Sequence, residues 1–121
     1  MTEKPRILIA DDEQVIRLLL RRILEAEGYS ITEVGNGEEA LKEAKREVPS
    51  LIVLDVTMPG INGFQACKRI REFSNVPIVL LSGIDNDEEK TKALGAGATE
   101  FLTKPFFPKE FAARIRDILK K

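Results

Sequence analysis

The sequence predicts an α/β fold in which five parallel strands form one doubly wound sheet with helices on both faces. Short apolar runs alternate with longer amphipathic segments five times along the chain. Parallel strands need long, usually helical, crossover connections, so this alternation favours a parallel sheet. Two runs, residues 51–54 and 78–81, are apolar throughout, as expected of strands covered on both faces. The alternation fills the chain, and we expect one domain over residues 1–121.

The first two strand–helix pairs have clear start and stop signals. Residues 6–10 form the first predicted strand, and Asp12 or its neighbour can cap the helix that follows. Gly28 is a natural stop for that helix. Residues 30–34 are more polar and are expected near an edge of the sheet, and Asn36 can cap the second helix. Helical spacing places one group of residues on the inner face of the first helix: Ile16, Leu19, Leu20, Ile23 and Leu24.

The other three pairs differ in how well their helices can pack. A turn containing Pro59, Gly60 and Gly63 follows the third strand, and the helix after it directs Phe64, Cys67 and Ile70 inward. Residues 86–96 form a poor amphipathic helix, which we expect to be the least firmly packed. Residues 100–103 form the fifth strand, and Pro108 fits the first turn of the last helix. The expected inner stripe of that helix is Phe107, Phe111, Ile115 and Ile118.

Composition and charge exclude several classes of function. Basic residues number 19 and acidic residues 20, a net charge of −1, which argues against direct nucleic-acid binding. The chain has one cysteine and no histidine, which excludes an internal disulfide, a cysteine zinc site and histidine-based catalysis. No apolar run approaches the roughly 20 residues that span a bilayer, and the N-terminus lacks the apolar core of a signal peptide. We expect a cytoplasmic protein without membrane contact.

Polar residues directly follow four of the predicted strands: Asp11 and Asp12, Asp55, Ser82, and Lys104. Because the carboxyl ends of parallel strands share one edge of the sheet, these side chains are expected to converge. Two unit charges about 5 Å apart repel by roughly 3 kcal/mol at an effective dielectric constant of about 20. The three carboxylates therefore need a cation, and oxygen ligands favour Mg²⁺ or a similar hard divalent ion such as Mn²⁺.

This edge of the sheet also predicts phosphoryl chemistry. Mg²⁺ is typically held by one or two carboxylates together with waters and a phosphate. Lys104 would supply a positive charge to the phosphoryl group and Ser82 a hydroxyl donor. A carboxylate can itself attack phosphorus, and Asp55, which ends the most buried strand, is the predicted nucleophile. Each residue alone has an ordinary structural explanation, as a helix cap, a turn residue or a surface lysine, but their coincidence at one edge favours a site.

Five ordered motifs surround these residues: Ile-Leu-Ile-Ala-Asp-Asp-Glu at residues 7–13, Leu-Asp-Val-Thr-Met-Pro-Gly-Ile-Asn-Gly at 54–63, Leu-Leu-Ser-Gly at 80–83, Gly-Ala at 95–96 and Phe-Leu-Thr-Lys-Pro-Phe at 101–106. Together they resemble the receiver domain of two-component response regulators, in particular single-domain regulators of the chemotaxis and sporulation type. The resemblance covers the chain from about residue 4 to its end. It implies a flavodoxin-like (βα)5 fold with strand order 2-1-3-4-5.

The resemblance implies a role for each residue of the site. Asp55 would be the phosphoacceptor and form an aspartyl phosphate. Asp12, the Asp55 carboxylate and the backbone carbonyl of Thr57 would bind Mg²⁺ directly, and Asp11 would act largely through a metal-bound water. Lys104 would pair with the phosphoryl oxygens.

The resemblance also implies how phosphorylation is transmitted. Ser82 would hydrogen-bond a phosphoryl oxygen and draw the following loop inward, and Phe101 would swing toward the space that Ser82 leaves. Tyr is common in the family at position 101, and Phe lacks its hydroxyl. The peptide bond between Lys104 and Pro105 would be cis. The exposed face formed by the fourth helix, the fifth strand and the last helix would regulate a downstream protein target or an output domain.

The phosphoryl donor must come from outside, because this chain has no histidine. The resemblance implies that the donor is a histidine kinase or a histidine phosphotransfer protein. It also implies that the receiver is a signalling switch that catalyses its own phosphorylation and dephosphorylation. Three alternatives differ from this. A pseudo-receiver would bind partners without phosphorylation, a nucleotide or flavin module would need a phosphate-binding loop after the first strand, and a Mg²⁺ phosphohydrolase would turn over small phosphomonoesters.

Overall fold

The computed structural model describes residues 4–120, in which five strands and five helices alternate without exception. Each strand ends within one residue of its predicted boundary. In chain order the elements are β1 (Arg6–Ala10), α1 (Gln14–Ala26), β2 (Ser30–Val34), α2 (Gly37–Arg46), β3 (Leu51–Asp55), α3 (Gly63–Arg71), β4 (Ile78–Ser82), α4 (Asp87–Ala96), β5 (Glu100–Thr103) and α5 (Pro108–Lys120).

The strands form one sheet with the order β2-β1-β3-β4-β5, and every neighbouring pair is parallel. This confirms the predicted fold class and strand order. The polar strand β2 lies at an edge, as its composition indicated. Between β2 and β4 the chain order reverses around β1 and β3, so the carboxyl ends of these two strands flank the point where doubly wound sheets form their sites.

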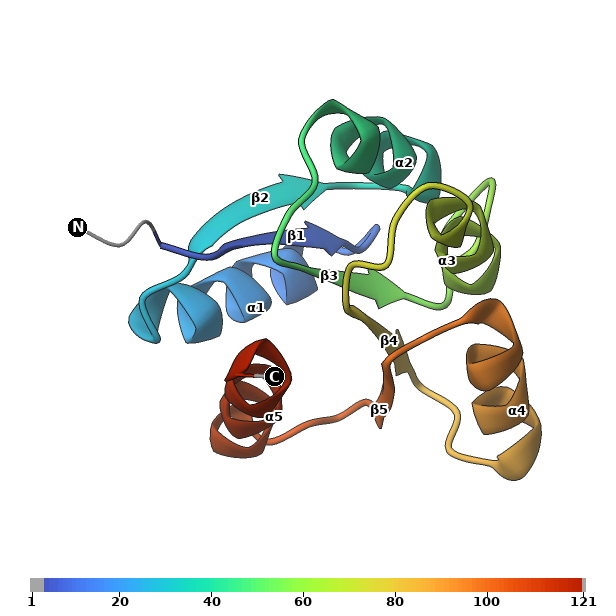
Figure 1. Ribbon diagram of the computed structural model, residues 1–121. Helices are drawn as coiled ribbons and strands as arrows, with labels where there is room; N and C mark the ends of the chain where they lie inside the picture. Colours follow the sequence, from blue (N-terminus) through green and yellow to red (C-terminus); the bar gives the residue numbers. More distant parts are fainter. Residues whose placement is uncertain (1–3, 121) are drawn as a thin grey trace.

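Helices cover both faces of the sheet, and each face has its own core (Figure 1). Helices α1 and α5 pack on one face, where Leu20, Leu24, Phe111 and Ile115 are buried. Helices α2, α3 and α4 pack on the other face, mainly through alanines, Cys67 and Ile70. Every residue of β3 and β4 is buried, which explains their uninterrupted apolar sequences. None of the helices in residues 4–120 is long and apolar enough to cross a bilayer.

The helix starts agree only in part with the sequence analysis. Asn36 caps α2 as predicted, since its side chain accepts a hydrogen bond from the Glu39 N–H. The N-cap of α1 is Glu13, the neighbour of Asp12, and its side chain makes no cap hydrogen bond. The side chain that accepts the Glu13 N–H is Asp11, at 2.9 Å. Asp12 is therefore free of a structural role as a cap and stands exposed beside the strand end.

Two predicted inner positions face solvent. Leu19 is 41% exposed, because the buried stripe of α1 runs through Leu20 and Leu24 and Leu19 falls at its margin. Phe107 is 71% exposed because it precedes α5. Its backbone carbonyl accepts the Phe111 N–H, so its position is fixed by the helix start and not by side-chain packing.

Helix α4 contributes little apolar surface to the core. Its buried apolar residues are Ala93 and Ala96, whereas Leu94 is 75% exposed. Gly97 ends the helix in the left-handed region at φ 91°, which favours glycine. The poor apolar stripe seen in the sequence is thus present in the structure, and the loose packing of α4 stays a prediction.

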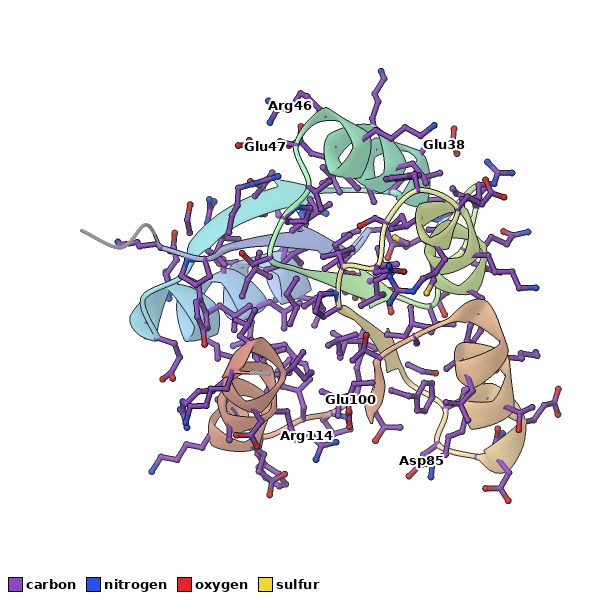
Figure 2. The ribbon with its side chains drawn as sticks, in the orientation of Figure 1. Glu38, Arg46, Glu47, Asp85, Glu100 and Arg114 are labelled. Carbon is purple, nitrogen blue, oxygen red and sulfur yellow. The ribbon has the colours of Figure 1, made fainter. Side chains whose placement is uncertain are left out.

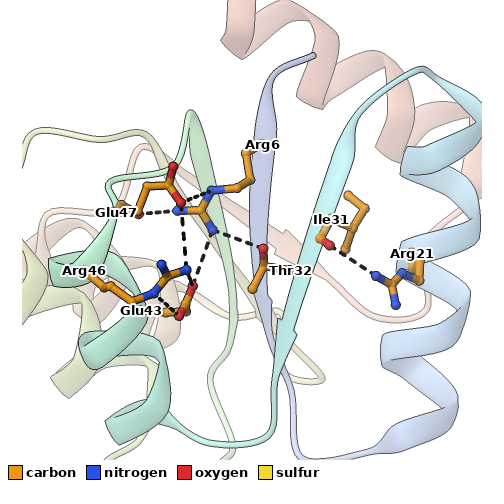
Figure 3. Close-up of polar contacts among 7 residues, drawn as sticks. All are labelled: Arg6, Arg21, Ile31, Thr32, Glu43, Arg46 and Glu47. Atoms are coloured by element: carbon orange, nitrogen blue, oxygen red, sulfur yellow. Dashed lines mark hydrogen bonds and ion pairs between the residues drawn. The ribbon is translucent and has the colours of Figure 1, made fainter. Parts of the chain in front are cut away.

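Surface ion pairs join neighbouring elements. Arg114 on α5 contacts Glu100 on β5 (Figure 2). Arg6, at the amino end of β1, hydrogen-bonds Thr32 on β2 and pairs with Glu43 and Glu47 at the end of α2 (Figure 3). The contacts of Arg6 join β1, β2 and α2 at the amino ends of the strands. Asp11 lies at the opposite, carboxyl ends, so the charges of Arg6, Glu43 and Glu47 lie away from the acidic site.

Gly63 is a position where the fold has no room for a side chain. A Cβ there would lie 2.4 Å from the carbonyl oxygen of Asp55 and 2.8 Å from the Val56 Cα. We expect Gly63→Ala to lower the free energy of unfolding by about 2 kcal/mol or more, because backbone must move. Gly95→Ala is the matched control: a Cβ there meets nothing within 4 Å. Because Gly95 lies within α4, Gly95→Ala should raise the free energy of unfolding, measured with urea, by about 0.5–1 kcal/mol. Equal stability of both variants would contradict this account.

Candidate functional site

The sheet brings the predicted residues to one edge through backbone hydrogen bonds that continue past the strand ends. The Asp11 N–H donates to the Val34 carbonyl at 3.3 Å, which carries Asp11 beyond β1 in an ordered position. The Lys104 N–H donates to the Ser82 carbonyl at 2.7 Å. Asp55 is itself the last residue of β3. The peptide bond from Lys104 to Pro105 is cis.

Three carboxylates meet at this edge. One carboxylate oxygen from each of Asp11, Asp12 and Asp55 lies within 4.8 Å of the other two. Asp11 and Asp55 are buried, whereas Asp12 is exposed. The group opens to solvent through a depression of about 290 Å³, whose lining includes Asp12, Asp55, Thr57 and Lys104. A small charged group arriving from solvent could therefore reach the buried Asp55 carboxylate.

Lys104 is the cation within the acidic group. Its Nζ lies 3.0 Å from Asp55 Oδ1 and 3.4 Å from Asp11 Oδ2, so one ammonium bridges the two buried carboxylates. The ammonium offsets one of three negative charges. Because the carboxylates of Asp11 and Asp55 are largely shielded from water, the negative charge that Lys104 does not offset is costly. This excess negative charge favours the binding of a second cation.

The pKa values record this unfavourable balance. Burial raises the pKa of the Asp55 carboxyl; the hydrogen bond from Lys104 opposes that rise and the charge of Asp11 adds to it. Burial likewise raises the pKa of Asp11, against the Glu13 N–H and Lys104. Burial alone would lower the pKa of Lys104, but Asp55 and Asp11 outweigh it and raise the pKa. Both buried carboxyls are therefore harder to ionise than in water, and the lysine stays charged.

The donor set fits a hard divalent cation. The atoms that face one another are carboxylate oxygens, and Thr57 on the rim can add a backbone carbonyl oxygen. Mg²⁺ prefers oxygen donors and keeps several waters, which an open depression allows. The excess negative charge, with two of the three carboxylates buried, supplies the attraction.

Ser82 and Phe101 lie near this edge but point elsewhere. The Ser82 hydroxyl accepts a hydrogen bond from the Ile84 N–H at 3.0 Å and donates to Oε1 of Glu89 on α4 at 3.2 Å. Phe101 is half-buried and lines a groove of about 250 Å³ between α4 and β5. Glu89 is a residue that the sequence analysis missed. The Asn-x-x-Glu pattern at residues 86–89 resembles a helix-capping signal. Glu89 therefore has an ordinary structural explanation in the sequence, and nothing there indicates its contact with Ser82.

The arrangement matches a known family. A family model described as the response regulator receiver domain matches residues 7–116. The chain belongs to this family. Phosphorylation-dependent switching is the general function of these domains, which interact with histidine kinases and output domains and generally bind Mg²⁺ at an acidic pocket. The family of the resemblance is thereby confirmed.

Relatives and solved structures agree with this assignment. The transcriptional regulatory protein YvrH of Bacillus subtilis (strain 168) is 46% identical over 120 residues, which are 98% of this chain and 51% of YvrH. The alkaline phosphatase synthesis transcriptional regulatory protein PhoP of the same organism is 43% identical, over 96% of this chain and 49% of PhoP. A receiver-domain structure, that of the Francisella response regulator 1452, superposes with a TM-score of 0.91 at 32% identity, covering 97% and 98% of the two chains. The chain spans about half the length of the curated relatives it matches.

Removing the Asp55 charge should stabilise the metal-free receiver. Asp55→Asn is expected to raise the free energy of unfolding by about 1 kcal/mol at pH 7 in a chelator, because the pKa of Asp55 is raised and its ionisation opposes folding. Below pH 3.8, the ordinary value, the carboxyl is protonated in both states and the difference should vanish; it opens as pH rises through the raised pKa.

Urea unfolding with and without Mg²⁺ measures this effect. Mg²⁺ should reduce the difference in free energy of unfolding between the two proteins, because it should stabilise the wild type more than Asp55→Asn. Asp12→Asn, at an exposed carboxylate, is the control and should change the metal-free stability less. A metal-free Asp55→Asn protein less stable than wild type at pH 7 would contradict the assignment of unfavourable charge to this site.

Proposed function

We propose that this receiver accepts a phosphoryl group on Asp55 from a histidine kinase or a histidine phosphotransfer protein, and that Asp55 phosphorylation is its signal. The observation that carries the proposal is the position of the Asp55 carboxylate. It ends the central strand β3, lies 3.0 Å from the Lys104 ammonium and faces an open depression. A buried nucleophile with a neighbouring cation and an entry path is what phosphoryl transfer requires.

The transfer needs positioning and charge neutralisation more than covalent assistance. An oxygen of the Asp55 carboxylate forms a bond to phosphorus while the bond from phosphorus to the donor histidine nitrogen breaks. The electron pair of that bond stays on the imidazole. Lys104 orients the phosphoryl oxygens and offsets part of the charge that they bring. In hydrolysis at the same site, a water oxygen bonds to phosphorus, the bond from phosphorus to the Asp55 oxygen breaks, and inorganic phosphate leaves the free carboxylate.

Mg²⁺, or Mn²⁺ in its place, would be held by Asp12, the Asp55 carboxylate and the Thr57 carbonyl, with Asp11 acting largely through a water. When bound, the ion supplies positive charge that lets a phosphoryl dianion approach the carboxylates. Lys104 orients the Asp55 carboxylate through its contact of 3.0 Å, and Asp11, 3.4 Å from the same ammonium, helps to fix the lysine.

The signal would reach partners through α4, β5 and α5. Once a phosphoryl group is present, Ser82 donates to it and the loop after β4 moves inward. Phe101 already lines the groove between α4 and β5 and would turn toward the vacated space. Arg114, which is exposed, and Glu100, which is partly exposed, contact each other on this face (Figure 2). A downstream protein or an output domain would bind here.

The remaining features of the proposal concern the whole protein. Residues 1–121 would constitute the receiver domain, with residues 1–3 and 121 outside the described structure. The relatives are about twice as long and are named as transcriptional regulators, which supports an output domain or a separate protein as the target. We also propose a cytoplasmic setting without membrane contact, and the net charge of −1 argues against direct contact with nucleic acid.

Phosphorylation can be tested with a small acyl phosphate and Mg²⁺, followed by intact mass measurement. The wild type should gain one phosphoryl group, and a chelator should prevent the gain. Asp55→Asn should gain none, and Asp12→Asn should be labelled far more slowly. A wild type that stays unmodified with both the acyl phosphate and a histidine kinase contradicts the switch, and persistent labelling of Asp55→Asn moves the acceptor to another residue.

Lys104 allows a test of charge complementarity to the phosphoryl group. Lys104→Gln should slow labelling by about 100-fold, the effect of removing one preorganised donor from a transferring group. Its Mg²⁺ affinity, measured by titration calorimetry, should stay equal or increase, because a competing cation is gone. Loss of both labelling and Mg²⁺ binding would show that Lys104 instead maintains the shape of the site.

A further inference from the structure

Helix α4 carries a buried acidic residue that the phosphoryl site does not use. Four polar or charged residues are buried among those that the structure describes: Asp11, Asp55, Ser82 and Glu89. The first three belong to the site at the strand ends. Glu89 lies outside it, on the first turn of α4, and is 8% exposed. Burying a carboxylate is costly unless a partner compensates it, so the contacts of Glu89 need an explanation.

The main partner of Glu89 is the hydroxyl of Ser82, which donates to Oε1 at 3.2 Å. The same hydroxyl oxygen accepts the Ile84 N–H at 3.0 Å. A serine hydroxyl has one hydrogen, and in this arrangement Glu89 holds it. Ser82 therefore cannot donate to a phosphoryl group on Asp55 until its bond to Glu89 breaks.

The position of Glu89 is itself fixed by α4. Its backbone N–H donates to the side chain of Asn86 at 2.8 Å, which anchors the start of the helix. Its second carboxylate oxygen lies 3.7 Å from the Lys92 ammonium, which is half exposed and equally close to Glu88. The glutamate is thus held by the helix frame, with a solvated lysine as a partial counter-charge.

The two ends of α4 are attached differently. At the C-terminal end, Arg71 of α3 donates to the Gly97 carbonyl at 2.8 Å, and a Cβ at Gly97 would meet the Arg71 side chain at 2.9 Å. At the N-terminal end, the bond from Ser82 to Glu89 joins the helix to β4. Release of that bond would free the N-terminal end of α4 and leave its C-terminal end in place.

We propose that Glu89 is a positioning residue that holds the Ser82 hydroxyl turned away from Asp55 in the unphosphorylated receiver. The inference rests on the proposed function of Ser82 as the phosphoryl ligand. Glu89 stabilises the state in which the hydroxyl points to α4, and phosphorylation must overcome this bond. When the bond from Ser82 to Glu89 breaks, the N-terminal turn of α4 is no longer joined to β4 through this contact. The bond would thus link phosphorylation of Asp55 to the face formed by α4, β5 and α5.

The first test uses the free protein and needs no phosphoryl group. The Ile84 amide reports on Ser82, because its N–H bonds to the serine oxygen. In ¹⁵N-labelled, metal-free protein, Glu89→Ala should move the Ile84 amide resonance toward its position in Ser82→Ala and speed its hydrogen exchange by about tenfold. Glu89→Gln keeps an acceptor for the hydroxyl and should restore most of the wild-type shift.

Glu88→Ala is the matched control. Glu88 precedes Glu89 on the same helix and contacts the same lysine at 3.7 Å, but its side chain is 79% exposed. Its removal should leave the Ile84 amide unchanged. If Glu89→Ala also leaves Ile84 unchanged, or if both variants move it equally, Glu89 does not position Ser82 and the proposal is wrong.

The second test measures the coupling between Ser82 and Glu89. Beryllofluoride with Mg²⁺ is the probe, as a stable mimic of the phosphoryl group. Glu89→Ala should tighten its binding by about tenfold in the wild-type background, the size expected for losing one competing bond to a charged group. In the Ser82→Ala background the same substitution should have no effect, because the hydroxyl is absent. An equal gain in both backgrounds overturns the proposal. Failure of the wild type to bind the probe would instead contradict the phosphoryl site, while the Ile84 measurement still tests Glu89.

Discussion

The burial of two carboxylates against one lysine is the constraint around which this receiver is organised. Asp11 and Asp55 sit at the ends of neighbouring strands, and the single ammonium of Lys104 bridges them. Unfavourable charge is thus concentrated at one place in the fold. The packing of the two hydrophobic cores offsets its cost. Under the proposed function, this excess of negative charge would attract a divalent cation, and the cation would offset the charge that a phosphoryl group brings. The unfavourable charge balance between Asp11, Asp55 and Lys104 would then contribute to cation binding.

Most of the architecture was readable from local patterns. Uninterrupted apolar runs identified β3 and β4, the polar run of β2 identified an edge, and residues after the strand ends identified the acidic site. These succeed because strand burial and the shared edge of a parallel sheet follow from topology alone. The margins of helix faces were less predictable. Leu19 and Phe107 are apolar at plausible spacings, yet the angle of α1 and the exact start of α5 leave both exposed.

The role proposed for Glu89 could not have been found in the sequence. A glutamate three residues after an asparagine at a helix start is expected to support the cap and face solvent. Which way its side chain points depends on where α4 lies against β4, and that is set by contacts between distant segments, such as the one from Arg71 to Gly97. The pairing of Ser82 with Glu89 joins residues from two elements, and only the folded chain brings them together.

The division of the core into two layers has a consequence for how the protein can change over time. Helices α1 and α5 share one set of buried side chains, and α2, α3 and α4 share the other, with the sheet between them. Substitutions in separate layers have few common contacts, so their effects on stability should nearly add. A lineage could thus retune the α4 side toward a new response while the α1 side keeps its packing, and the sheet would act as a partition between two independently adjustable halves.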